Sequence, residues 1–426
     1  MSASNSESLQ KIMEAVDHRA ETTIQMLQEL VRIPSVTGQE LAVQEAVQRM
    51  FQERNLEVDR WVATDEEFVP YRSHVGHLQN LENRPVLVGK RKGAGSGQSI
   101  LLNAHIDTVP EGDHNEWDYD PFGAAIDGDL LFGRGSADMK AGLVTFLAAL
   151  DAIDAAGVSL AGDVLINSVP GEEGSGYGTL STVLRGYRAD AAVISEPTRL
   201  RLVPATGGLI TCRLRIFGKA AHGASRDEGV SAVEKFIPVF QGIMELEKEL
   251  NAKRNHPLYD WVSNKAPISF GIVQSGNWPS TVPEELTAIG RVGLLPGESV
   301  DEIKAVFEQR VRDVAEKDPW LREHPPRVEW LPRDNHPAEI PADSAICEAI
   351  RHAFNQVEGS DPIVQGVTYG ADTRMFTLFT DVPCVMFGAG DIAVAHRANE
   401  HISTSDLIRA VKVVAALLVN WTAEKT

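Results

Sequence analysis

Cysteine and positive charge are scarce in this chain of 426 residues. The three cysteines, Cys212, Cys347 and Cys384, lie far apart and form no CxxC pair, which argues against a disulfide framework and fits a reducing cytoplasm. Lysine and arginine number 40 against 60 acidic residues, so the formal net charge is −20. A surface this acidic repels phosphate backbones and anionic membranes, so we expect neither nucleic acid nor a membrane as a partner.

Long apolar runs are also missing. The longest run, around residues 411–421, is interrupted by Lys412 and Asn420 and is too short to span a bilayer. The first residues are polar and charged, so no signal peptide is expected. Hydrophobic residues nevertheless make up 43% of the chain, and its length suits two domains. These features predict a cytoplasmic globular protein.

Short apolar segments alternate with helical patterns at both ends of the chain. This alternation predicts an α/β domain with a mainly parallel sheet. Strands are expected at residues 86–88, 99–103, 163–168, 191–194 and 382–387. Helices are expected at residues 8–33, 144–156, 179–184, 342–356 and 404–421.

From residue 207 the pattern changes to that of a smaller α+β unit. Residues 210–217 alternate as a half-buried strand, and the order continues as helix, strand, strand, helix and strand up to residue 331. This split βαβ order predicts a ferredoxin-like domain inserted into the first one. The expected domains are residues 1–206 and 333–426 for the larger one and 207–332 for the insertion.

The strand at residues 99–103 leads into a His-x-Asp segment formed by His105, Ile106 and Asp107. Ligand sites of open α/β sheets collect at the carboxyl ends of the strands. A histidine that binds a metal needs a partner on its other ring nitrogen, and Asp107 can supply one. Taken alone, this short motif more often marks a structural histidine beside a turn aspartate.

Four further segments place acids or a histidine at expected turns. They contain Asp138 in a glycine-rich loop, the adjacent pair Glu172 and Glu173, Glu196 after a strand, and His396 near the C-terminus. Singly, each segment also fits a capping residue or a solvated acidic turn. Adjacent carboxylates repel each other, and a metal would resolve that repulsion, with one acid as ligand and the other as base. Mixed histidine and carboxylate ligands suit Zn²⁺, and also Co²⁺ or Mn²⁺.

The order of these motifs, with Trp117-x-x-x-Pro121-Phe122 after the first, resembles the M20 metallopeptidase family. That family includes acetylornithine deacetylase, succinyl-diaminopimelate desuccinylase, aminoacylase and carboxypeptidase G2. The similarity runs from about residue 27 to the C-terminus. It implies a catalytic domain with two Zn²⁺ ions and an inserted lid that forms a homodimer, to which the strand at residues 210–217 and a helix at 229–251 could contribute.

The resemblance also implies roles for the motif residues. Glu172 would act as general base and acid, and Asp107 would orient His105. Five residues would ligate the two ions: Asp138 as the bridge, Glu173 with His396 at one ion, and His105 with Glu196 at the other.

Further roles concern the substrate. His222 in the inserted domain would reach across the dimer to stabilise the oxyanion. Arg374, near the glycine turn at Gly370, would hold a substrate carboxylate, or else form a structural ion pair with Asp372. Ser280 stands where relatives often carry the asparagine of an Asn-x-x-Pro turn that touches the substrate, so the exact substrate is open at this point.

These observations predict a two-zinc amide hydrolase that removes an acetyl, formyl or succinyl group from the nitrogen of an amino acid or similar small amine. A dipeptidase or carboxypeptidase of the same fold is one alternative. A deformylase of a heterocyclic amine is another, and the altered turn at Ser280 favours it. A catalytically inactive binding protein is a further alternative, against which the intact set of site residues argues.

Overall fold

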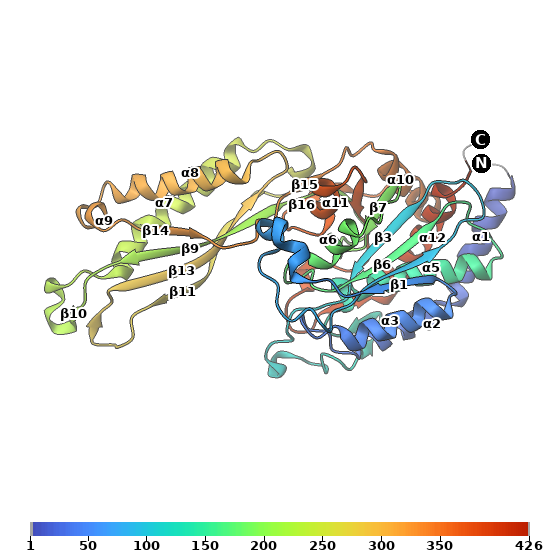
Figure 1. Cartoon of the computed structure of the whole chain (residues 1–426), viewed down its shortest axis with the longest axis horizontal. Coiled ribbons are helices and arrows are strands. Elements are labelled where there is room, and N and C mark those ends of the chain that lie inside the picture. Colours follow the sequence, from blue (N-terminus) through green and yellow to red (C-terminus); the bar gives the residue numbers. More distant parts are fainter. Residues whose placement is uncertain (1–2, 425–426) are drawn as a thin grey trace.

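The central sheet of the larger, main domain contains the predicted parallel strands. The computed structural model describes residues 3–424 and forms one nine-stranded sheet in the order β1-β2-β6-β3-β7-β17-β8-β15, with β16 paired to β8 (Figure 1). The parallel strands at its centre are β6 (Val164–Val169), β3 (Ile100–His105), β7 (Ala191–Ile194) and β17 (Cys384–Met386). The predicted α/β class with a mainly parallel sheet is confirmed.

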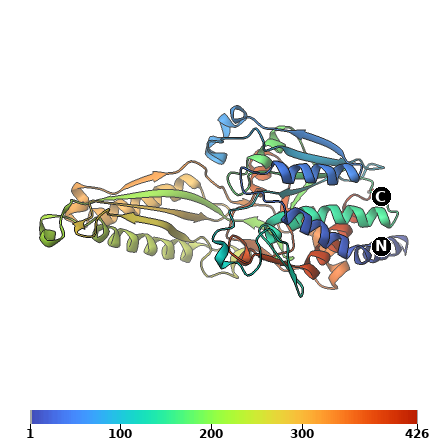
Figure 2. The same ribbon diagram turned by 90° about the horizontal axis from the view of Figure 1, so that it is seen from below.

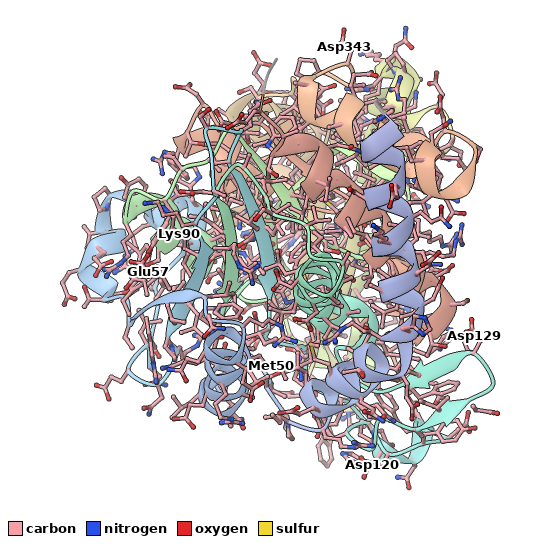
Figure 3. The ribbon with its side chains drawn as sticks, turned by 90° about the vertical axis from the view of Figure 1, so that its right-hand side faces the viewer. Met50, Glu57, Lys90, Asp120, Asp129 and Asp343 are labelled. Atoms are coloured by element: carbon pink, nitrogen blue, oxygen red, sulfur yellow. The ribbon has the colours of Figure 1, made fainter. Side chains whose placement is uncertain are left out.

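The strands that flank this centre pair antiparallel to their neighbours, apart from one parallel pair between β16 and β8, and all of them except β2 were missed by the sequence pattern. On one side lie β2 (Val86–Arg91) and β1 (Glu57–Trp61), whose ends pair Lys90 with Glu57 (Figure 3). On the other side lie β8 (Leu202–Thr206), β15 (Ala338–Glu339) and β16 (Val364–Val367). These strands are short, so too few residues reveal the period of two.

Helices cover the sheet, and one helical prediction is wrong. The expected single helix at residues 8–33 is two helices, α1 (Ala3–His18) and α2 (Ala20–Val31), separated at Arg19, whose backbone leaves the helical range. The break lets the two helices follow different paths across the buried α5 (Ala141–Ala155). The other helices that cover the sheet are α3 (Leu41–Glu53), α6 (Tyr177–Leu184), α10 (Ala345–Glu358), α11 (Thr373–Phe379) and α12 (Thr404–Trp421).

The inserted domain extends away from the main domain as an elongated unit (Figures 1 and 2). Its four-stranded antiparallel sheet has the order β11-β13-β9-β14. The strands are β9 (Gly208–Phe217), β11 (Ile268–Ser275), β13 (Glu285–Leu294) and β14 (Arg327–Trp330), and the helices are α7 (Ala232–Lys253) and α8 (Val300–Ala315). With this element order, the sheet has the predicted ferredoxin-like arrangement.

Each domain has its own hydrophobic core. The core of the inserted domain forms a cluster around Phe307, separate from the cluster of the main domain that contains Phe146. The chain passes between the two sheets after Thr206 and again after Trp330, and the exact boundaries at 207 and 332 stay predictions. Among the helices described between residues 3 and 424, none combines the length and hydropathy of a membrane span.

We expect Phe307→Ala to lower the unfolding free energy of the inserted domain by about 3–5 kcal/mol, because a fully buried ring is removed from a small core. Phe146→Ala is the matched change in the main domain, where the ring is equally buried. Denaturant unfolding of both variants, followed by hydrogen exchange of each domain, measures the effect. If both variants weaken both domains equally, the two cores unfold as one unit and separate stability is refuted.

Candidate metal centre

The expected ligands gather where three neighbouring parallel strands end. His105 is the last residue of β3, Glu172 and Glu173 follow β6, and Glu196 follows β7. Because β6, β3 and β7 are adjacent and parallel, their carboxyl ends meet at one edge of the sheet. The prediction that each ligand lies at the end of a different strand of one sheet is therefore correct for His105, Glu173 and Glu196. It is wrong for Asp138, which lies in the turn before α5 and follows no strand of this sheet.

Asp138 enters the same region from the turn that precedes α5. Gly135 in this turn has a left-handed backbone with φ of 81°, and a Cβ atom there would lie 2.6 Å from the Thr108 side chain. The turn is anchored by Lys140, whose Nζ donates to two main-chain carbonyl groups at the end of α2, at 2.9 and 2.8 Å. The peptide bond between Asp138 and Met139 is cis.

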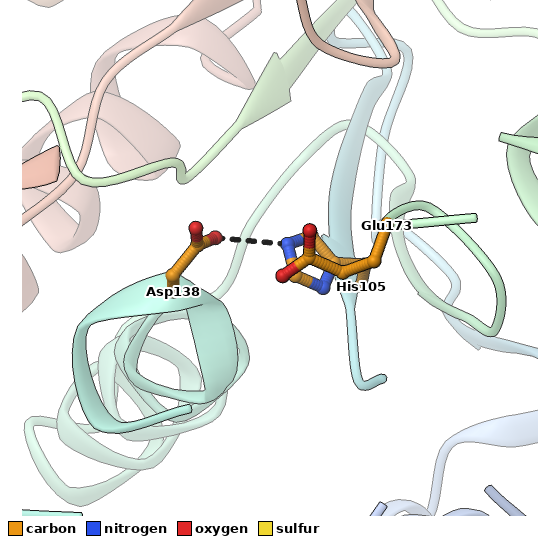
Figure 4. Close-up of side chains that lie close together, drawn as sticks. All are labelled: His105, Asp138 and Glu173. Atoms are coloured by element: carbon orange, nitrogen blue, oxygen red, sulfur yellow. Dashed lines mark hydrogen bonds and ion pairs between the residues drawn. The ribbon is translucent and has the colours of Figure 1, made fainter. Parts of the chain in front are cut away.

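The side chain of Asp138 lies between the two histidines. Its Oδ1 is 3.0 Å from Nε2 of His105 (Figure 4), and its Oδ2 is 3.3 Å from Nε2 of His396. Glu173 Oε1 lies 2.9 Å from the same nitrogen of His396. Glu196 Oε1 lies 3.9 Å from Nε2 of His105. The contacts divide the five residues into two sets that share Asp138.

Burial and mutual repulsion raise the pKa of three carboxyl groups here. The pKa of Glu172 lies well above its usual range because the side chain is buried and faces Asp372. The pKa of Glu196 is also raised well above that range, by burial and by Asp138. Burial and Asp138 raise the pKa of Glu173 as well.

The histidines hold protons that partly balance this negative charge. Hydrogen bonds with Asp138 and Glu173 raise the pKa of His396 to about 10. Burial opposes the charged form of His105, but the hydrogen bond with Asp138 and the negative charges of Glu196, Asp138 and Glu172 together raise its pKa well above the usual value. Metal cations would replace these protons, because histidine binds metals as a neutral imidazole.

The donor set fits metal ions of the zinc type. One ligand atom each from His105, Asp138 and Glu173 lie within 4.8 Å of one another. Histidine nitrogen and carboxylate oxygen are the donors that catalytic zinc uses. Five donors exceed the three that one catalytic zinc usually takes, which favours two ions with Asp138 between them.

Asp107 supports the centre in a different way from the one expected. Nδ1 of His105 lies 2.9 Å from the main-chain carbonyl of Asp107, whereas the carboxylate Oδ1 is 3.8 Å away. The carboxylate accepts hydrogen bonds from the Thr37 hydroxyl at 2.8 Å and from the main-chain N–H groups of Glu172 and Glu173 at 3.1 and 3.3 Å. Asp107 thus orients His105 through its backbone and the glutamate turn through its side chain.

The residues expected to contact the substrate lie in three places. Arg374 is 2% exposed, and its Nη2 donates to the Ser175 carbonyl at 3.0 Å beside the buried Asp372. Gly370 packs against Asn335, whose Oδ1 would lie 2.6 Å from an added Cβ. His222 and Ser280 lie together in the inserted domain.

The tip of the inserted domain carries His222 on β10 (Ala221–His222), far from the metal centre of the same chain (Figure 1). Its Nδ1 accepts from the Ala224 N–H at 3.1 Å, and the neighbouring Gly223 N–H donates to the Ser280 carbonyl at 2.7 Å. Within one chain these two residues therefore do not meet the other site residues.

Two buried charged residues near the centre received no role from the sequence. Arg134 and Glu400 form an ion pair, and Glu400 also accepts from the main-chain N–H of Asp138. Both residues stand inside motifs that were already singled out, next to Gly135 and four residues after His396. A charged residue inside a glycine-rich turn was the available signal, since buried charges are usually paired or functional.

The amino-acid sequence of the chain is similar to those of a known family and of several of its members. The model of peptidase family M20/M25/M40 matches residues 101–420. The N-formyl-4-amino-5-aminomethyl-2-methylpyrimidine deformylase of Bacillus subtilis (strain 168) is 29% identical over 364 residues, covering 80% of this chain and 84% of its own. A probable succinyl-diaminopimelate desuccinylase of Staphylococcus epidermidis is 27% identical, with coverage of 72% and 80%.

The fold is likewise similar to that of a solved structure. The di-peptidase Dug1p from Saccharomyces cerevisiae superposes with a TM-score of 0.79 at 15% identity, covering 98% of this chain and 99% of its own. At that identity the match bears on the fold alone.

We expect two metal ions per chain, and different effects from the adjacent acids. Glu173→Gln removes a ligand that contacts His396 and should lower the metal content. Glu172→Gln should keep both ions while turnover falls by ~10²–10⁴-fold, as for a lost general acid–base group. Elemental analysis and activity assays of both variants test this. Metal loss in Glu172→Gln with retention in Glu173→Gln would show that the two roles are exchanged.

Proposed function

The chain belongs to peptidase family M20/M25/M40, and we propose that it removes a formyl group from the amine nitrogen of a small, flat heterocycle. Family membership and the curated relatives confirm the predicted class, a metal-dependent hydrolase of linear amide bonds that removes acyl groups. Within that class, the choice between an N-acyl amino acid and an N-formyl heterocycle depends on what holds the amine part of the substrate.

The buried position of Arg374 is the observation that carries the proposal. Its guanidinium donates to the Ser175 carbonyl and lies beside the carboxyl groups of Asp372 and Glu172, which partly offset the cost of its burial. With Nη2 bound to a main-chain carbonyl and the side chain 2% exposed, this guanidinium does not offer an open two-point fork for a ligand carboxylate. A substrate without a carboxylate fits this arrangement better than an amino acid does.

A cavity of about 230 Å³ beside Glu196 supports the same choice. Pro197, directly after Glu196, forms one wall, and Val367, Tyr369 and Ile392 form others. The indole of Trp261 completes the lining and is fixed by its Nε1, which donates to the Gly366 carbonyl at 2.9 Å. Apolar and aromatic walls of this kind suit a flat ring that stacks on them.

Polar side chains also line this cavity, and several of them are paired with one another. Arg199 forms an ion pair with Asp391, and Arg201 donates to Gln365 at 2.8 Å. The Tyr369 hydroxyl is buried and has no hydrogen-bond partner among residues 3–424. Burial and the nearby Glu196 raise the pKa of Tyr369 well above its usual range, so the hydroxyl keeps its proton and can donate to a ring nitrogen.

In the proposed reaction, Glu172 transfers the proton. When bound, the metal ions would polarise the amide carbonyl and make water acidic. Glu172 takes the proton of the attacking water and passes it to the amine nitrogen as the carbon–nitrogen bond breaks, which yields formate and the free amine. Its buried position and the nearby carboxyl group of Asp372 raise its pKa, which helps the group to hold a proton before passing it on. Asp107 fixes the main chain of Glu172 for this role.

The physiological ions are proposed to be Zn²⁺, with Co²⁺ or Mn²⁺ as substitutes, because the donors are histidine and carboxylate. The proposed location is the cytoplasm. The three cysteines are free and buried, as suits a reducing compartment.

A homodimer would supply the group that one chain lacks. His222 lies at the far tip of the inserted domain, so its proposed role at the oxyanion requires a second chain. The expected pairing through residues 210–217 needs correction, because β9 lies inside the sheet between β13 and β14. The edge strands of this sheet are β14 and β11, and β11 exposes Ile272 and Val273.

Beside the edge strand β11, the helix α7 presents an apolar surface that belongs to the proposed contact. The helix α7 exposes Val233, Ile237 and Phe240, with 40%, 50% and 38% of their surface accessible. An edge strand with exposed β-branched residues is a ready template for pairing with another chain. We propose that β11 and α7 of two chains pair around a two-fold axis.

The substrate proposal predicts that N-formyl-4-amino-5-aminomethyl-2-methylpyrimidine is hydrolysed with a higher kcat/KM than N-acetyl, N-formyl and N-succinyl amino acids or dipeptides. Trp261→Ala should raise KM for the pyrimidine roughly 10-fold, as expected for a lost stacking contact of about 1–3 kcal/mol, and Trp261→Phe should restore most of it. Amine release with Zn²⁺ present provides the measurement.

Each N-acyl amino acid is compared with its carboxamide as a control. Equal rates agree with a buried Arg374 that grips no carboxylate. A strong preference for the free acid, with no turnover of the pyrimidine, would replace the proposal by an amino-acid deacylase, and preferred dipeptides would replace it by a peptidase.

The dimer proposal predicts a sedimenting mass of about twice 46.4 kDa for the purified protein. Ile237→Lys combined with Val273→Lys should give monomers, because two charges would be buried in the contact. Ile363→Lys changes an exposed isoleucine of the main domain and serves as the control. An active wild-type monomer would contradict both the dimer and the role of His222.

A further inference from the structure

The ion pair between Arg134 and Glu400 is buried beside the metal centre, and none of the steps above uses it. The two side chains are 2% and 1% exposed, and Nη1 of Arg134 lies 2.5 Å from Oε2 of Glu400. A buried ion pair is weak evidence for stability, because desolvation of both charges offsets much of their attraction. Its location therefore calls for an explanation other than stability.

The second oxygen of Glu400 holds the turn that carries Asp138. Oε1 accepts hydrogen bonds from the main-chain N–H groups of Ala137 at 3.1 Å and of Asp138 at 3.2 Å. The main-chain carbonyl of Glu400 also accepts from the N–H of Gly133 at 2.9 Å. Glu400 thus binds both ends of the segment 133–138, which carries the Asp138 carboxylate shared by the two ligand sets.

Arg134 connects the carboxylate of Glu400 to the segment that follows His105. Nη2 of Arg134 donates to the Pro110 carbonyl at 3.3 Å, and the guanidinium lies 5.3 Å from the centre of the Trp117 ring. Glu400 itself follows His396 by four residues. One ion pair therefore joins the three loops that carry His105, Asp138 and His396.

We infer that Glu400 is a positioning residue, which with Arg134 fixes the backbone of Asp138 so that its two oxygens face both histidines at once. Residues outside the ligand shell orient the ligands of metal sites, and their loss typically lowers metal affinity by roughly 10–100-fold. The inference rests on the proposed metal-binding role of Asp138.

The test compares Glu400→Gln with the wild type by calorimetric titration of the metal-free protein with Zn²⁺. The substituted glutamine keeps the shape of the side chain but carries no charge to pair with Arg134, so the ion pair is broken. We expect the affinity for Zn²⁺ to fall about 10–100-fold and full stoichiometry to return at high Zn²⁺. In the metal-free state, hydrogen exchange of the Ala137 and Asp138 amides should become faster.

A second variant distinguishes the loss of positioning from misfolding caused by an unpaired buried charge. Arg134→Met with Glu400→Gln removes both charges, so no lone charge stays buried, and the same loss of affinity is expected. The control is Glu298→Gln, which breaks the partly buried ion pair of Glu298 with Arg254 in the inserted domain. It should lower thermal stability without changing Zn²⁺ affinity.

The outcomes separate this inference from the proposed metal site. If the wild type binds no Zn²⁺, the metal proposal itself fails. If the wild type binds Zn²⁺ and both Glu400 variants bind it with unchanged affinity and unchanged exchange at residues 137 and 138, Glu400 has only a structural role and the inference is overturned.

Discussion

Carboxyl groups crowd together in the interior of the main domain, and their mutual repulsion shapes what surrounds them. Glu172, Glu173 and Glu196 follow neighbouring parallel strands, and Asp138 faces them from the turn before α5. Burial makes the repulsion stronger, because fewer water molecules screen it. Such a cluster is stable only where cations or protons lie between the acids, which is the arrangement that the two histidines provide.

The repulsion among these acids also explains which residues surround the proposed metal ligands. The carboxylate of Asp107 accepts from donors of the glutamate turn and of Thr37, and Arg374 lies as a buried cation between acids. The buried charge of Asp107 is thus met by donors that also fix the glutamate turn. Rigidity of the loops follows from charge compensation, and a hydrolase needs that rigidity to hold ligands at fixed distances.

Much of this could be predicted from residue pattern. The acids after β6 and β7 were placed correctly because strand ends are visible in sequence and parallel strands share an edge. The inserted domain followed from the alternation along β9, which the buried faces reproduce. The break at Arg19 and the short strands of the sheet edge depend on tertiary packing, which local periodicity does not encode. The same holds for Arg374 and Glu400, whose roles arise only when distant segments bury them.

Trp261 stands on the segment between α7 and β11, apart from every strand that carries a ligand. If Trp261 contacts the amine side of the substrate as proposed, that part and the parts that break the amide bond are encoded in different stretches of the gene. Under this proposal, substitutions around Trp261 would change which amine is accepted while the ligand set stays intact. This separation gives natural selection a route by which one chemistry diverges towards many substrates, as the deformylase and desuccinylase relatives illustrate.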